Sequence, residues 1–209
     1  SGLPSAELLS DRQIFESTKI YDRAGETLLY EIHGEEKRTI IPFEEISQRV
    51  KQATIAIEDE NFYEHLAFDL KSILRAFLVN LSRGKIAQGG STITQQLAKN
   101  AFLTPERTIV RKLKEITLAV RLEKKFTKDE ILYLYLNQIP YGSNAYGIEA
   151  ASQTFFGKKT KDFNLPETAL LASLPKAPSY YSPYGSHLDE LLARKDLVLE
   201  KMHQLEFID

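Results

Sequence analysis

The 209-residue sequence contains no cysteine, only four histidines and no long apolar run. The absence of cysteine excludes disulfides, zinc–thiolate sites and thiol nucleophiles. The four histidines are scattered along the chain, which does not favour a histidine metal site. A membrane-spanning helix needs about 18 or more consecutive apolar residues. No segment of this sequence is therefore predicted to cross a bilayer.

Strong charge of either sign is also missing, because the formal net charge is -2. This balance gives no general argument for binding to nucleic acid or to an anionic surface, so any basic site must be local. Hydrophobic residues make up 43% and charged residues 27% of the chain, which is ordinary for a globular protein with a buried core. The length fits one domain, or one domain with a small second lobe.

A short β region is predicted only near the front of the chain. Strands at 18–21 and 27–32 flank a turn that contains Gly25, and this pattern predicts a β-hairpin. A third short strand is expected at Thr39–Ile41. After Pro42 the apolar residues recur at helical spacing, so the fold class is mainly α rather than a parallel-sheet α/β fold.

The helices are delimited by capping residues, prolines and glycines. Thr104-Pro105-Glu106 should start a helix whose buried side carries Ile109, Leu113, Ile116 and Val120. Thr127 and Glu130 form an expected capping box. The expected helices are 42–57, 69–84, 92–101, 104–124, 131–137, 146–156, 164–175 and 188–204.

An acidic break, Ala56–His65, holds four carboxylates and one imidazole between apolar helices. A carboxylate at the end of an apolar helix, beside Phe62, can be partly desolvated, and this makes it a better base. Glu58 is the candidate catalytic base. The alternative is an acidic loop whose carboxylates cap the next helix or pair with lysines.

A glycine-led helix start follows at Gly89–Asn100. Two glycines and then hydroxyls expose backbone N–H groups at the positive end of a helix, which suits an anion or a polar sugar. A plain capped surface helix is the alternative. The candidate binding residues in this stretch are Ser91, Thr92, Gln95, Gln96, Lys99 and Asn100.

A basic strip lies on the helix expected at 104–124. At about 100° per residue, Arg107, Arg111, Lys114 and Glu115 fall within a third of the circumference, with Lys112 on the border. Such a strip can bind a diphosphate, although a solvated basic face gives the same pattern. Glu115 could pair with Arg111, hold a divalent cation or orient a substrate phosphate.

Five ordered motifs resemble those of the peptidoglycan glycosyltransferases, or transglycosylases, of glycosyltransferase family 51. Ala67 is one departure, since the family usually has glycine there. The resemblance covers about residues 17–204. The motifs are Glu58-Asp59-x-x-Phe62-x-x-His65, Gly89–Asn100, Arg111-Lys112-x-x-Glu115, Lys128-x-Glu130-Ile131-x-x-x-Tyr135-Leu136-Asn137 and Glu167-x-x-x-Leu171-Ala172-x-x-Pro175-x-x-Pro178.

The resemblance implies a lysozyme-like helical lobe with a smaller membrane-facing jaw at about 66–110. Residues 17–209 would form the glycosyltransferase domain and residues 1–16 a juxtamembrane leader. A single-pass membrane anchor would precede Ser1, and the transpeptidase domain of a bifunctional class A penicillin-binding protein would follow Asp209. The domain would stand on the outer, or periplasmic, face of the bacterial cell membrane.

The resemblance also implies a reaction, the polymerisation of lipid II into β-1,4 glycan with loss of undecaprenyl diphosphate. Glu58 would deprotonate the acceptor 4-hydroxyl, and Glu115 would be a second acid near the donor diphosphate. Glu115 is also a candidate ligand for Mg²⁺ or Mn²⁺. No organic cofactor is expected. Phe102 and Leu103 would rest on the bilayer or belong to the core. The residues implied to bind substrate are Asp59, Ser91, Thr92, Gln95, Gln96, Lys99, Asn100, Arg107, Arg111, Lys112 and Lys114.

Moenomycin-type inhibitors are expected in the same donor cleft. Two other functions stay open on the sequence. A lysozyme-like glycan hydrolase would share the fold and a catalytic glutamate without needing a diphosphate site. A non-catalytic glycan-binding or membrane-surface module would need neither a catalytic glutamate nor a diphosphate site.

Overall fold

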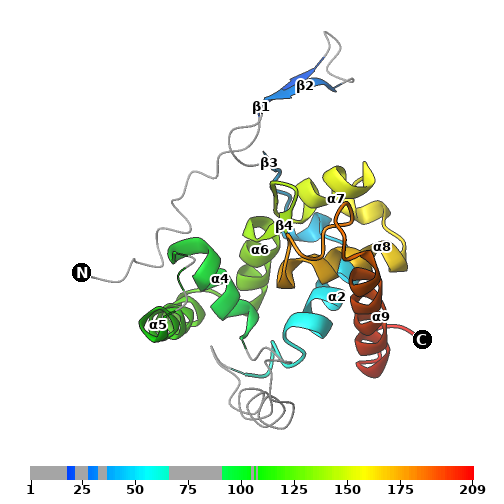
Figure 1. Ribbon diagram of the computed structural model, residues 1–209. Coiled ribbons are helices and arrows are strands. Elements are labelled where there is room, and N and C mark those ends of the chain that lie inside the picture. The colour runs from blue at the N-terminus through cyan, green and yellow to red at the C-terminus, as the bar shows by residue number, and fades with distance from the viewer. Residues whose placement is uncertain (1–17, 22–27, 33–36, 66–90, 105, 107) are drawn as a thin grey trace. The chain divides into compact units, whose positions relative to one another are not determined.

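The computed structural model describes residues 18–21, 28–32, 37–65, 91–104, 106 and 108–209 (Figure 1). Helices dominate this part of the chain, which confirms the predicted mainly α class. Within it, no helix combines the length and the hydropathy needed to span a membrane. The helix predicted at 69–84 and the loop at Gly84–Gly90 lie outside the described residues.

The strands are short. β1 (Thr18–Tyr21) pairs antiparallel with β2 (Leu28–Ile32), as the hairpin prediction required. In a second sheet, β5 (Ala145–Tyr146) pairs with β4 (Pro140–Gly142) and, in parallel, with β3 (Lys37–Arg38).

The strand predicted at Thr39–Ile41 is wrong, because a side chain replaces the strand partner there. The Ile41 N–H donates to Asn137 Oδ1 at 3.1 Å, and Asn137 Nδ2 donates to the Ile41 carbonyl at 3.2 Å. The amide of Asn137 thus satisfies both backbone groups of Ile41.

The chain divides into two compact units. Of the described residues, the first unit holds Thr54–Tyr135, and the second holds Leu136–Asp209 with the segment that ends at Ala53. α2 (Gln48–Glu58) ends in the first unit, and α6 (Lys128–Gln138) begins there. Two further helices of that unit, α4 (Ile93–Phe102) and α5 (Ile109–Lys125), pack against each other.

Local signals explain where α2 and α6 begin. Pro42 precedes a short 3₁₀ turn, η1 (Phe43–Glu45), so the predicted start of the helix at Pro42 is early and α2 begins at Gln48. The predicted capping box at α6 is confirmed. The Thr127 N–H donates to Glu130 Oε2 at 2.7 Å, and the Glu130 N–H donates to Thr127 Oγ1 at 3.3 Å.

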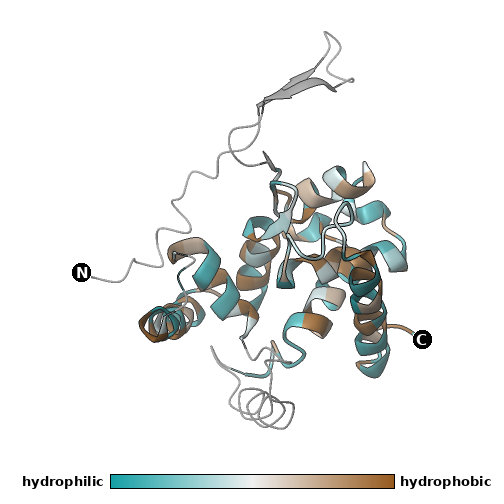
Figure 2. Cartoon of the chain, viewed as in Figure 1, coloured by the Kyte–Doolittle hydropathy of each residue, from teal (hydrophilic) through white to brown (hydrophobic). Residues whose placement is uncertain are grey.

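The sequence prediction for α5 was wrong in its start and in part of its buried side, since only Ile116 and Val120 of the four predicted residues are half-buried. Thr108, not Thr104, caps the helix, and its hydroxyl accepts from the Arg111 N–H at 3.1 Å. Ile109 and Leu113 were expected in the core but are 82% and 61% exposed. Hydrophobic and hydrophilic residues both occur on α5 (Figure 2). The repeat that packs on α4 carries Glu115, Leu118, Ala119 and Leu122.

The second unit contains the remaining helices. α7 (Ile148–Phe156) ends at Gly157, which has a φ of 66° in the left-handed region that favours glycine. A reciprocal capping box starts α8 (Leu165–Ser173), which leads into η3 (Leu174–Lys176) and packs on α9 (Leu188–Gln204). A 3₁₀ turn, η2 (Thr160–Asp162), follows α7. The limits of α9 match the predicted helix.

Candidate active site

Glu58 is the last residue of α2, and its half-buried carboxylate reaches α4. Gln96 Nε2 donates to Glu58 Oε2 at 2.8 Å. The hydroxyl of Tyr135, on α6, donates to Gln96 Oε1 at 3.2 Å. Three helices therefore meet at the candidate base through one chain of hydrogen bonds.

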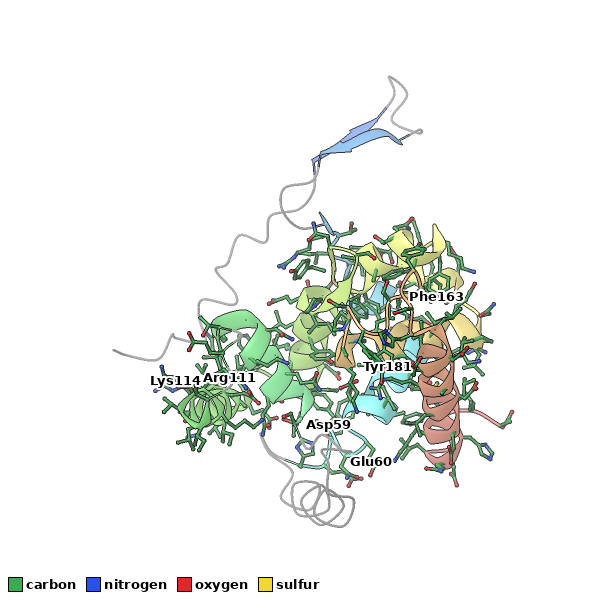
Figure 3. All side chains as sticks on the ribbon, in the orientation of Figure 1. Asp59, Glu60, Arg111, Lys114, Phe163 and Tyr181 are labelled. Atoms are coloured by element: carbon green, nitrogen blue, oxygen red, sulfur yellow. The ribbon has the colours of Figure 1, made fainter. Side chains whose placement is uncertain are left out.

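Asp59, next to the candidate base, holds the start of α4. Its buried Oδ2 accepts from the Ile93 N–H at 3.0 Å, and its Oδ1 lies 2.6 Å from His65 Nε2. A carboxylate at the start of a helix accepts from a backbone N–H that has no partner within the helix, and its negative charge interacts favourably with the positive end of the helix dipole. Figure 3 labels Asp59 where α2 ends. His65 thus contacts the residue that holds the start of α4, and contact of Asp59 with substrate stays a prediction.

A cluster of cations surrounds Glu115, the one acid of the basic strip. Glu115 is only 2% exposed. Its Oε2 accepts from Arg111 Nη1 at 3.1 Å, and its Oε1 accepts from Lys112 Nζ. Lys112 Nζ also donates to Ser91 Oγ at 2.7 Å and to Gln95 Oε1 at 3.1 Å. These bonds join α5 to the start of α4.

Lys99, on α4, is the third cation of this group. Burial lowers the pKa of its ammonium below the ordinary value of 10.5. The negative charges of Glu115 and Glu58 raise the pKa of Lys99, whereas the positive charges of Arg111 and Lys112 lower it. Lys99 is therefore in electrostatic range of both the candidate base and the cation cluster. Because three cations face two carboxylates here, the group carries an excess of one positive charge.

The donor set does not fit a divalent cation at Glu115. Both carboxylate oxygens of Glu115 already accept from cationic side chains. Mg²⁺ and Mn²⁺ are usually bound by one or two carboxylates together with substrate phosphates and water, so the metal needs a carboxylate oxygen that no cation already engages. Among the described residues, no three histidine, aspartate or glutamate side chains gather in a way that could bind a metal ion.

The structure groups some of the predicted residues and separates others. Thr92 is buried as the N-cap of α4, where its hydroxyl accepts from the Gln95 N–H at 3.2 Å. Asn100 and Lys114 are exposed, and Lys114 has no bond to the cation cluster among the interactions described (Figure 3). Arg107 lies outside the described residues.

Sequence reasoning misjudged two members of the site. Lys112 was placed on the border of the strip, yet it is the residue that joins Ser91, Gln95 and Glu115. Tyr135 entered the sequence prediction only as part of a motif, with no role assigned to its hydroxyl. The available signal was a tyrosine inside an apolar helix, because a buried phenol usually needs a hydrogen-bond partner.

The comparison with protein families decides the assignment. The family model described as transglycosylase matches residues 25–203. This chain belongs to the transglycosylase family. The match spans the candidate base, the cation cluster and both compact units.

Relatives of this transglycosylase chain are penicillin-binding proteins. Penicillin-binding protein 1A of Aquifex aeolicus is 47% identical over 206 residues, which are 99% of this chain and 28% of that protein. Penicillin-binding protein 1A of Pseudomonas aeruginosa is 47% identical over 207 residues, which are 99% of this chain and 25% of that protein. The chain therefore spans less than a third of the length of these relatives.

A solved structure supports the same fold. The crystal structure of penicillin-binding protein 1A from Haemophilus influenzae matches with a TM-score of 0.52 and 27% sequence identity. The match covers 93% of this chain and 19% of that one. The described part of this chain thus shares its fold with a part of that penicillin-binding protein.

Proposed function

We propose that the chain is a peptidoglycan glycosyltransferase that polymerises lipid II into β-1,4-linked glycan. The family match supports a transglycosylase, and the relatives named above support a role in the bacterial cell wall. The observation that carries the proposal is the pairing of a candidate base, Glu58, with three cations in the same compact unit.

The chemistry needs both halves of this arrangement. The acceptor 4-hydroxyl attacks the anomeric carbon of the donor as the bond from that carbon to the diphosphate oxygen breaks. The hydroxyl proton passes to Glu58, and the bonding electron pair leaves on the diphosphate. A positioned base and pre-oriented cations lower the barrier of such a displacement. One displacement converts an α-linked donor into a β-linked product.

The cation cluster is the proposed site for the departing diphosphate. Its excess positive charge favours an anion, and charge-assisted hydrogen bonds to phosphate are strong. Lys112 is held in place by Ser91 and Gln95 before any ligand arrives. The exposed Lys114 and Asn100 would add contacts at the edge of the site, and a contact of Arg107 with the phosphates stays an expectation from the sequence. A moenomycin-type inhibitor would compete for the same cations.

Membrane attachment is the second part of the proposal, and α5 supports it. Ile109, Val110 and Leu113 form an apolar surface at the start of this helix, and they are 82%, 62% and 61% exposed. Exposed lysines and an exposed arginine continue along the helix. Apolar groups with basic neighbours suit a bilayer with anionic headgroups. Phe102 and Leu103 are half-buried. With this surface of α5 on the outer face of the cell membrane, the site would lie near a lipid-linked substrate.

The function is tested with fluorescent lipid II in detergent or liposomes, using Glu58→Gln beside the unaltered chain. Loss of a general base lowers the rate by about 10²- to 10⁴-fold, and thermal unfolding should show that the variant stays folded. Polymer formation by the unaltered chain and its loss in Glu58→Gln would support the proposal. Equal turnover by both would refute the role of Glu58.

The same assay separates the hydrolase and the binding module. Glycosidases use two carboxylates across the scissile bond, whereas Glu115 here is engaged by Arg111 and Lys112. Release of reducing ends from finished glycan, without polymer formation, would show a hydrolase. Binding of glycan with no turnover of either substrate would show a binding module.

A further inference from the structure

Tyr135 is a buried aromatic residue whose hydroxyl reaches towards the candidate base. It is 0% exposed, in the middle of α6. Its hydroxyl donates to Gln96 Oε1 at 3.2 Å, and Gln96 Nε2 donates to Glu58 Oε2 at 2.8 Å. The side-chain amide therefore relays a hydrogen bond from the core of the unit to the carboxylate.

The relay has a fixed direction. An ionised carboxylate only accepts hydrogen bonds, so Gln96 must turn its NH₂ group towards Glu58. Gln96 Oε1 then faces Tyr135, which can donate. A flipped amide would place its carbonyl oxygen against the carboxylate and its NH₂ group towards the phenol. Donation by the phenol favours the first orientation, and bonds aligned in series strengthen one another.

Asp59 fixes the backbone next to the base, which leaves the side chain of Glu58 to be oriented. The bond from the Ile93 N–H to Asp59 ties the end of α2 to the first turn of α4. Gln96 stands one turn further along α4, on the side that reaches Glu58. The backbone position is thus set by Asp59 and the carboxylate orientation by Gln96.

We propose that Tyr135 is a positioning residue of the transfer reaction, which orients Gln96 so that its NH₂ group holds the carboxylate of Glu58 towards the acceptor hydroxyl. This inference rests on the proposed function of Glu58 as the base. It assigns Gln96 to the base side of the site rather than to the donor phosphates. Tyr135 itself does not touch substrate.

The experiment is a double-mutant cycle with Tyr135→Phe and Gln96→Ala in the 209-residue chain, assayed for kcat and KM on lipid II. Tyr135→Phe should lower kcat by about fivefold to tenfold, the effect of one hydrogen bond. KM for lipid II and affinity for inorganic pyrophosphate should stay within about twofold, because the cations are unchanged. Gln96→Ala should also lower kcat without raising KM.

The double variant gives the decisive result. If Tyr135 acts through Gln96, adding Tyr135→Phe to Gln96→Ala lowers kcat no further. Independent, additive losses would overturn the inference, and so would a full kcat in Tyr135→Phe. A raised KM with unchanged kcat in Gln96→Ala would place Gln96 on the donor instead.

Loss of a buried hydroxyl by itself is controlled with Tyr141→Phe. Tyr141 is also 0% exposed but belongs to the second unit. It should leave kcat unchanged, and thermal unfolding of every variant is measured in parallel. If Tyr135→Phe does not fold, the kcat and KM of Gln96→Ala still test the base side of the relay, because Gln96 is only half-buried; a raised KM with unchanged kcat would then overturn the inference.

Failure of the inference differs from failure of the proposed function. In the first case, the unaltered chain polymerises lipid II and depends on Glu58, but Tyr135→Phe keeps its full kcat. In the second case, the unaltered chain forms no polymer, or Glu58→Gln remains as active. That result overturns both proposals together.

Discussion

Replacing Lys99 by methionine should stabilise the fold while it weakens anion binding. Burial is the main influence on Lys99, and the net effect of its surroundings is to lower its pKa. The folded state therefore disfavours the charged ammonium, even though Glu58 and Glu115 attract it. Methionine has a similar length and no charge to desolvate. The stabilising and binding effects of Lys99→Met should thus have opposite signs.

The size of the effect follows from the half-burial of Lys99. Replacing fully buried ionic groups by apolar ones can stabilise by about 1 to 4 kcal/mol. Because solvent still screens part of this side chain, we expect about 1 kcal/mol for Lys99→Met. For a chain of this size, that raises Tm by roughly 2 to 4 °C. Loss of one charge-assisted bond should weaken pyrophosphate binding by about tenfold or more.

The stability difference should depend on pH in a defined direction. Below the lowered pKa of Lys99, the unaltered chain bears the full cost of the buried charge. Between that pKa and the ordinary value of 10.5, the unfolded chain binds more protons than the folded one, so the stability of the unaltered chain rises with pH. The advantage of Lys99→Met should therefore be largest below the lowered pKa and should vanish as pH approaches 10.5.

Circular dichroism melting curves and calorimetric titration with inorganic pyrophosphate measure the two effects. Lys124→Met is the matched control, since Lys124 is exposed on α5 and should change neither quantity. A lower Tm for Lys99→Met, or pyrophosphate affinity equal to that of the unaltered chain, would refute the reasoning. Lys99→Arg should bind pyrophosphate at alkaline pH, where the lysine has lost its proton.

Two further outcomes are expected. Asp59→Asn loses the charge on the start of α4 and the charged bond to His65, so unfolding should need about 2 kcal/mol less, a Tm drop of roughly 4 to 8 °C. The exposed Asp162→Asn is its control, and an unchanged Tm for Asp59→Asn would contradict the role of Asp59. Titration with Mn²⁺, followed by its electron paramagnetic resonance, should show no saturable site that Glu115→Gln removes, because two cations engage Glu115. A site lost in that variant would restore a metal at Glu115.

Local signals in the sequence were enough to predict most helices. The capping box at Thr127 and the extent of α9 are confirmed because they depend on neighbouring residues. The start of α5 was not predictable in the same way, since Thr104 and Thr108 both suit a cap. Only the packing of α5 on α4 decides between the two apolar repeats.

The candidate site shows a similar division. Glu58, Lys99 and Lys112 were predicted from their residue types and their motifs, and the structure brings them into one compact unit. The hydrogen bond from Tyr135 to Gln96 joins positions 39 residues apart. A local sequence pattern cannot predict a contact between residues so far apart in the chain. Lys112 was placed at the border of its helix because an ideal wheel ignores the reach of a lysine side chain. Its bonds to Ser91 and Gln95 cross to another helix.

α4 is the element that relates the base to the cations. Gln95 and Gln96 are adjacent, so their side chains leave the helix about 100° apart. Gln95 bonds to Lys112, whereas Gln96 bonds to Glu58. Lys99 lies one turn beyond both and is in electrostatic range of each group. One rigid helix therefore sets the separation between the group that takes the proton and the charges that receive the leaving diphosphate. A substitution that bends α4 should impair both at once, whereas Tyr135→Phe should affect only the base.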